Sequence, residues 1–277
     1  MNLKPEKLIQ LETLFLEKNW EIEKEEERFA SLFNRFCNRL GIYDEEKQDL
    51  ILELTNDFLN VPLNEIFEYF VNSIKKIDGL ETYNSIIICP LKKSKEKKTK
   101  SCDHLWYHLK NFCDFSYETF HGSLKFISEW RHIKTELLKD NSLLIFIDDY
   151  IGSGLTVDET IEELARSGNL NENINYRISS LIATEIGINN IAEKYGNIIA
   201  CNKIVYRGIS DKYLGEVLIK KSKIMEQIEL KLNVSTKFKF GFSQSESLVA
   251  IQNKSPNNTF PVFWLEKKGK LAPFKTR

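Results

Sequence analysis

Two adjacent carboxylates, Asp148 and Asp149, come directly after an apolar run and just before a turn of small residues. The run, residues 143–147, is rich in β-forming side chains and predicts a buried strand of a parallel sheet. Open α/β sheets place their ligand crevice at the carboxyl ends of strands, which is where both aspartates fall. Carboxylate oxygens at that place can accept hydrogen bonds from the hydroxyl groups of a sugar.

The turn that follows, residues 152–156, reads Gly-Ser-Gly-Leu-Thr. Thr156 and Glu159 have the Thr-x-x-Glu spacing of a capping box, which predicts that a helix begins at this point. The backbone N–H groups of such a loop and helix end can bind a phosphate. Strand, acid pair, turn and helix therefore predict a site for a phosphorylated sugar. The alternative is an ordinary strand, turn and helix with two solvated aspartates.

The segment from Asp148 to Thr156 resembles, without a gap, the signature of the type I phosphoribosyltransferase family. In that family the acid pair holds the 2- and 3-hydroxyls of phosphoribosyl pyrophosphate, and the loop holds its 5-phosphate. The resemblance implies that Asp148 and Asp149 are the ribose-binding and catalytic residues and could hold a Mg²⁺ ion. It also implies that the turn binds the ribose phosphate through Gly152, Ser153, Gly154, Leu155 and Thr156.

Two positions of the turn depart from the family pattern. Many purine-specific members have an acid where this chain has Gly152, and relatives often have Gly or Lys where it has Leu155. Gly152 has no carboxyl group that could lie beside a nucleobase and assist the reaction. The binding half of the motif is therefore better kept than the catalytic half.

The composition is that of an ordinary soluble protein. The chain has 277 residues, 42% of them hydrophobic, and a formal net charge of -1, so it has no overall attraction to nucleic acid. No segment approaches the roughly 20 apolar residues that cross a bilayer, and the polar start lacks the apolar core of a signal peptide. The five cysteines are odd in number and scattered. We therefore expect a cytoplasmic protein with reduced thiols and no membrane contact.

The pattern divides the chain into a helical segment, residues 1–78, and an α/β segment, residues 79–277. The first segment shows apolar residues at helical spacing. It is either a small module like a winged helix or, as we favour, a set of helices packed against the later sheet. From residue 85 onward, β-rich runs alternate with helical ones, including strands expected at 177–185 and 197–205. The predicted fold class is α/β, a mainly parallel sheet flanked by helices as in type I phosphoribosyltransferases, with a helical N-terminal extension.

A basic segment follows the strand expected at residues 85–90. Six of the nine residues from Lys92 to Lys100 are lysines. By charge alone such a run is more often a solvated loop, but it lies where phosphoribosyltransferases keep their pyrophosphate loop. Lys100 and Ser101, at the start of the next helix, could bind phosphate, and so could Arg207, which follows a later strand. The lysines could instead contact a nucleic-acid backbone, and that binding would depend strongly on salt.

The C-terminal stretch 253–264 contains a second motif. Asn257 and Asn258 lie in a turn signal between strands expected at 247–252 and 259–264. The stretch resembles the Asn-x-x-Pro-Asn-Asn-Thr-x-Pro-x-x-Trp segment of a phosphoribosyltransferase-like family found in bacterial conflict and defence loci, including some retron systems. The two asparagines offer paired donors and acceptors and are candidate pocket residues, although a plain hairpin turn is the alternative.

Two functions of different classes follow from these observations. The first is a transferase or nucleotide hydrolase that acts at the anomeric carbon of a ribose-phosphate or nucleotide, mainly by positioning and charge neutralisation. Such an enzyme would be an effector or component of an antiphage defence system with protein partners. The second is a catalytically inactive nucleotide sensor or scaffold that binds partner proteins or nucleic acid. Gly152 favours the second, and the intact acid pair keeps the first open.

Overall fold

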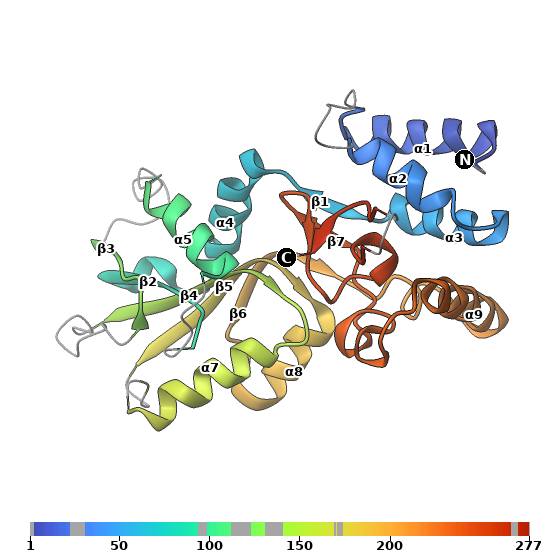
Figure 1. The fold of residues 1–277 in the computed structure, drawn as a ribbon. Helices are drawn as coiled ribbons and strands as arrows, with labels where there is room; N and C mark the ends of the chain where they lie inside the picture. Colours follow the sequence, from blue (N-terminus) through green and yellow to red (C-terminus); the bar gives the residue numbers. More distant parts are fainter. Residues whose placement is uncertain are drawn as a thin grey trace. The chain divides into compact units, whose positions relative to one another are not determined.

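The strand that carries the acid pair lies at the centre of a five-stranded parallel sheet in the computed structural model (Figure 1). Across the sheet the strands are β3 (Ser123–Phe126), β2 (Ser85–Pro90), β4 (Ser142–Ile151), β5 (Asn175–Thr184) and β6 (Ile199–Val205). The structure describes residues 3–22, 31–93, 99–111, 123–130, 141–168, 170, 174–266 and 271–276.

Helices lie on both faces of this sheet (Figure 1). On one face, Ile161 and Ile191 pack in a buried cluster with Phe146 of β4. On the other face, the hydroxyl of Ser73 lies 2.6 Å from that of Ser179 in β5. The predicted class, α/β with a mainly parallel sheet flanked by helices, is confirmed. The α-helices in the described part of this unit are α4 (Ile66–Ile74), α5 (Ser101–Asn111), α7 (Leu155–Arg166) and α8 (Glu185–Tyr195).

Contacts group the chain into two compact units. Asn64–Val205 forms one, called here the sheet unit, and Met1–Leu63 together with Tyr206–Arg277 forms the other, called the terminal unit. α4 packs on β5 and β6 of the sheet. The contacts therefore group residues 64–78 and 206–277 differently from the two segments expected by pattern.

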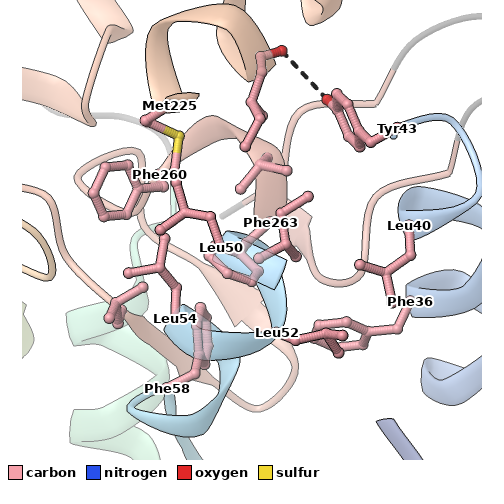
Figure 2. Packing of buried hydrophobic residues seen from close by; sticks show 14 of the residues in the cluster. Phe36, Leu40, Tyr43, Leu50, Leu52, Leu54, Phe58, Met225, Phe260 and Phe263 are labelled. Atoms are coloured by element: carbon pink, nitrogen blue, oxygen red, sulfur yellow. Dashed lines mark hydrogen bonds between the residues drawn. The ribbon is translucent and has the colours of Figure 1, made fainter. Parts of the chain in front are cut away.

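The terminal unit joins the two ends of the chain in one core. Phe58, just after α3, stacks on Phe274 with 4.7 Å between ring centroids and lies 4.8 Å from Phe263. Leu50 of α3 and Met225 of α9 belong to the same cluster (Figure 2). Each aromatic pair contributes about 0.5–1.5 kcal/mol beyond its burial. The helices are α1 (Pro5–Glu17), α2 (Leu32–Leu40), α3 (Glu45–Asn56) and α9 (Gly215–Leu232), and the strands are β1 (Leu59–Val61), β7 (Val249–Ile251), β8 (Lys254–Ser255) and β9 (Lys275–Thr276).

The prediction of a strand at residues 259–264 is wrong. Among the described residues, the only β-pairing of Thr259 is an isolated bridge with Ser247, and the chain then forms a short 3₁₀ turn over Pro261–Phe263. Pro261 has no N–H to donate to a neighbouring strand and its fixed φ suits the start of a helical turn. The Trp264 ring closes this turn by donating to the Thr259 carbonyl at 2.6 Å.

No helix in the described part of the chain combines the length and the apolar character that crossing a bilayer requires.

Candidate functional site

The acid pair lies where β4 loses one of its two neighbours. β2 pairs with β4 only as far as Ile147, whereas β5 follows β4 to Ile151. Asp148 and Asp149 therefore lie inside the strand, and on the β2 side their backbone is beyond the end of the ladder. Asp149 is buried, at 7% exposure, and Asp148 is partly exposed. The Asp148 carboxylate accepts a hydrogen bond from the Asp149 N–H at 2.9 Å.

The turn after β4 differs from the predicted capping box. α7 begins at Leu155, its N-cap is Gly154, and Thr156 is already the second helical residue. Gly154 has φ 81°, a left-handed conformation that glycine adopts without steric cost. Because Thr156 lies inside the helix, it is not the N-cap, and Thr156 and Glu159 do not form the expected capping box. Gly154, the actual N-cap, has no side chain with which to cap the helix. In the described structure the first N–H groups of α7 donate no hydrogen bond to a capping side chain. An anion at the helix start needs such donors.

Hydrogen bonds from α8 and from its N-cap residue hold this turn in place. The Thr184 hydroxyl donates to the Gly152 carbonyl at 2.6 Å and accepts from the Gly187 N–H at 2.9 Å. The Asn190 side chain donates to the Ser153 carbonyl at 3.1 Å. These support residues were not identified from the sequence. The only signal was a threonine at the end of a strand, three residues before a glycine.

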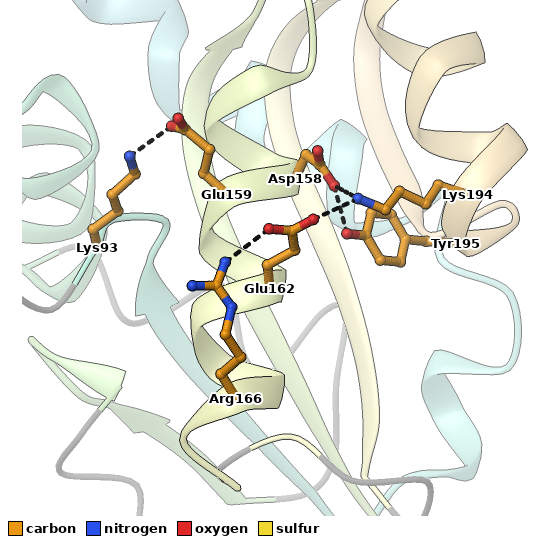
Figure 3. A network of polar contacts seen from close by, with 7 residues as sticks. All are labelled: Lys93, Asp158, Glu159, Glu162, Arg166, Lys194 and Tyr195. Carbon is orange, nitrogen blue, oxygen red and sulfur yellow. Dashed lines mark hydrogen bonds and ion pairs between the residues drawn. The ribbon is translucent and has the colours of Figure 1, made fainter.

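An ion-pair network joins α7 to α8 further along both helices (Figure 3). Lys194 lies 2.5 Å from Asp158 and 2.8 Å from Glu162, and Glu162 also pairs with Arg166 at 2.8 Å. The Tyr195 hydroxyl donates to Asp158 at 2.5 Å. Hydrogen bonds to Asp158 and Glu162 raise the pKa of Lys194. Exposed pairs such as these contribute little each, but together they link the two helices that shape the turn.

Two acids hold the ends of the lysine-rich segment. Asp103 lies 2.5 Å from the Lys92 ammonium and accepts the Lys100 N–H at 2.9 Å. Glu159 of α7 lies 2.7 Å from Lys93 (Figure 3). Partial burial alone would lower the pKa of Lys92, but the hydrogen bond and charge of Asp103 outweigh it and raise that pKa. The start of the segment is thus tied to both α5 and α7.

The beginning of α5 lies near the acid pair. α5 packs on β4, and Cys102, its second residue, is buried with its thiol 3.5 Å from the Leu91 carbonyl. Burial and the nearby charge of Asp148 raise the pKa of the Cys102 thiol. The structure therefore brings Lys100, just before α5, and Ser101, its first residue, to the same edge of the sheet as Asp148. The lysines of the basic segment that fall in 94–98 lie outside the described residues.

The other three predicted ligand residues belong to the terminal unit. Arg207 pairs with Asp211 at 2.8 Å. Asn258 is buried and donates to the Phe242 carbonyl at 3.2 Å, and the Asn257 carbonyl accepts the Phe242 N–H at 2.8 Å. These contacts shape loops of that unit. A ligand role for the three residues stays a prediction.

The donor set at the acid pair fits a magnesium ion only together with a ligand. Mg²⁺ is usually held by one or two carboxylates plus substrate phosphates and water. Asp148 and Asp149 supply two carboxylates, and no group of three or more metal-binding side chains occurs among the described residues. A magnesium ion at this place would therefore arrive with the phosphates of its ligand.

Comparison with known proteins gives the family of the chain. The model of the family PRTase-CE matches residues 43–276. The chain belongs to the PRTase-CE family. It is therefore a phosphoribosyltransferase-like protein, as its acid-pair motif predicted, and the match spans both compact units. No curated protein matches the chain.

Two solved structures show distant similarity to this PRTase-CE protein. Helicobacter pylori xanthine-guanine-hypoxanthine phosphoribosyltransferase is 11% identical, with 53% of this chain and 83% of that chain covered and a TM-score of 0.28. A putative phosphosugar isomerase involved in capsule formation, from Bacteroides fragilis, is 13% identical, with 69% and 92% covered and a TM-score of 0.25.

Proposed function

We propose that the sheet unit binds a ribose phosphate or a nucleotide. Asp148 and Asp149 would accept hydrogen bonds from the ribose hydroxyls, and the turn 152–156 would bind the phosphate through its N–H groups. The observation that carries this proposal is the position of the turn. It follows the acid pair directly, and its left-handed Gly154 starts α7 with no capping side chain. Lys100 and Ser101 would add a second contact for phosphate.

An enzyme built on this site would act at the anomeric carbon. The bond from that carbon to pyrophosphate or to a base would break, and a base nitrogen, a pyrophosphate oxygen or water would form the new bond. The incoming group loses its proton where it has one, and the leaving group takes the electron pair of the broken bond. The acid pair would orient the ribose, and bound Mg²⁺ would neutralise the charge of pyrophosphate.

A nucleotide sensor is the second candidate, and Gly152 favours it. Many purine-specific phosphoribosyltransferases have an acid at this position, whereas here the Gly152 carbonyl is engaged by Thr184. We propose a cytoplasmic role in antiphage defence with protein partners for either function, because the tail 253–264 resembles the defence-associated branch. Contact of the lysine-rich segment with nucleic acid is the less favoured reading, since Lys92 and Lys93 already pair with carboxylates.

Calorimetry with ribose 5-phosphate and with phosphoribosyl pyrophosphate, both with Mg²⁺, tests the pocket. We expect the wild type to bind and the double variant Asp148→Asn/Asp149→Asn to bind at least about tenfold more weakly, because hydrogen bonds to charged groups are lost. Asp78→Asn, an exposed acid of the same unit, is the control and should bind like the wild type. Wild-type protein that binds neither compound would refute the pocket.

Turnover separates the two functions. Release of pyrophosphate or of free base from a panel of labelled compounds, abolished in the double variant, supports the enzyme. Binding without turnover, also in the presence of partner proteins, supports the sensor. Nucleic-acid binding whose affinity falls steeply with salt would instead indicate phosphate contacts by the lysine segment.

A further inference from the structure

The turn after β4 is attached to α8 through two consecutive carbonyl groups. Thr184 is the N-cap of α8, and its hydroxyl oxygen accepts the Gly187 N–H at 2.9 Å. A capping hydroxyl uses only its oxygen in that contact, so its proton is available. It is donated to the Gly152 carbonyl at 2.6 Å. The next carbonyl, that of Ser153, accepts the Asn190 amide at 3.1 Å.

The packing against α8 leaves no space for the turn to move closer. A Cβ on Gly187 would lie 2.0 Å from the Gly152 carbonyl oxygen, and a Cβ on Gly154 would lie 2.9 Å from the Ile191 side chain. Both glycines are therefore needed for the approach. The hydrogen bonds act across a direct backbone contact and not across a gap.

These two bonds determine where the N–H groups of the turn point. In a trans peptide the C=O of one residue and the N–H of the next point in opposite directions, and no described peptide bond is cis. Because the Gly152 and Ser153 carbonyls point toward α8, the N–H groups of Ser153 and Gly154 point away from it. Within the described residues neither N–H donates to a protein group. Successive N–H groups that point the same way form an anion-binding concavity.

We propose that Thr184 and Asn190 are positioning residues that aim the Ser153 and Gly154 N–H groups at the phosphate of the ligand. This inference rests on the proposed function, since it concerns how the same turn binds phosphate. Neither side chain needs to touch the ligand. They hold the peptide planes in the binding orientation before the ligand arrives, which lowers the entropy lost on binding.

Asn190→Ala tests the proposal with a closely matched control. Asn190 is exposed on α8, so its truncation should not unfold the unit. Asn189→Ala removes the same side chain from the neighbouring exposed position, which makes no described hydrogen bond to the turn. We expect Asn190→Ala to bind ribose 5-phosphate about threefold to tenfold more weakly than Asn189→Ala. Affinity for unphosphorylated ribose, from an NMR titration, and the Tm should be equal in the two variants.

Substitutions of Thr184 give an independent second test. Thr184→Ser keeps the hydroxyl and should bind ribose 5-phosphate like the wild type, whereas Thr184→Val loses both bonds and should weaken phosphate binding more than ribose binding. Equal affinity of the Asn190 and Asn189 variants for ribose 5-phosphate, with the wild type binding it, would overturn this inference and leave the proposed function standing. Equal weakening toward ribose and ribose 5-phosphate would also overturn it. A wild type that binds no ribose 5-phosphate would overturn both.

Discussion

Among the described residues of the terminal unit, Glu229 of α9 is a carboxyl group in an unusual environment. It is fully buried, and Oε1 accepts the Phe240 N–H at 2.8 Å. Oε2 has no hydrogen-bond partner in the described structure. Burial raises the pKa of Glu229 to about 7, and the bond from Phe240 only partly opposes this. A buried carboxyl without full compensation prefers its neutral form.

Glu229 should therefore make stability depend on pH. In the unfolded chain the carboxyl ionises near its ordinary value of 4.5, whereas the folded protein keeps the proton until about pH 7. Unfolding thus releases a proton between these values, and the free energy of unfolding falls as pH rises from about 4.5 to about 7. Glu229→Gln removes this dependence. It should raise the free energy of unfolding by up to about 3 kcal/mol at pH 8 and by little at pH 4, as measured by urea unfolding.

Glu216→Gln at the start of the same helix is the control for this measurement, because Glu216 is exposed and its charge is not among those that act on Glu229. It should leave the pH profile of the wild type unchanged. A Glu229→Gln profile that runs parallel to the wild type from pH 4 to pH 8 would contradict the assignment.

The junction between β4 and α7 depends on one glycine. Gly154 has φ 81° and a Cβ there would meet Ile191 and the Gly187 carbonyl, whereas Gly168, just after α7, has φ 72° and nothing within 4 Å. Alanine at either position bears the left-handed penalty of about 1–2 kcal/mol. Only Gly154→Ala also forces a contact, which typically costs a further 1–3 kcal/mol, as an order-of-magnitude figure.

Comparing Gly154→Ala with Gly168→Ala therefore isolates the packing of the turn on α8. Urea unfolding should show the larger loss of stability for Gly154→Ala, and only that variant should lose affinity for ribose 5-phosphate. If the two variants lose equal stability and bind alike, the turn is not held against α8 as described.

The strand β4 could be predicted from the sequence, whereas the start of α7 and its contacts with α8 could not. The apolar run 143–147 predicted its strand because periodicity and β-propensity are local properties. The helix start was misplaced because Thr156 and Glu159 fit a local capping rule, while the actual cap depends on contacts between Gly154 and residues more than thirty positions away. Thr184 and Asn190 were missed for the same reason. Their partners are set by how two helices meet on the sheet, and a pattern of residue types along one segment contains no such information.

The chain ends in the same compact unit in which it begins. Both ends of the chain contribute to the terminal unit, and the sheet unit is the stretch between them. The four described cysteines report on both units, because Cys37 lies in the terminal unit and Cys89, Cys102 and Cys201 lie in the sheet unit. All four are buried. Each can react only when the surrounding unit opens.

Thiol labelling should therefore follow the opening of each unit. Burial raises the pKa of Cys37 to about 11 and also raises the pKa values of the three thiols of the sheet unit. For Cys37 this alone reduces the reactive thiolate at pH 8 on the order of a hundredfold. We expect slow native-state labelling by iodoacetamide in a Cys113→Ser variant, which removes the cysteine outside the described residues. As urea is raised, mass spectrometry should find the three sheet-unit cysteines labelled together.

The labelling rate of Cys37 then shows whether the two units unfold independently or together. If they open independently, Cys37 will show its own urea dependence, and Glu229→Gln at pH 8 will slow labelling of Cys37 while leaving the other three unchanged. One common urea dependence for all four cysteines would mean that the terminal unit and the sheet unit unfold as one. Rapid labelling of a single sheet-unit cysteine in the native protein would contradict the buried core, because the thiol would then be reached without opening of the unit that surrounds it.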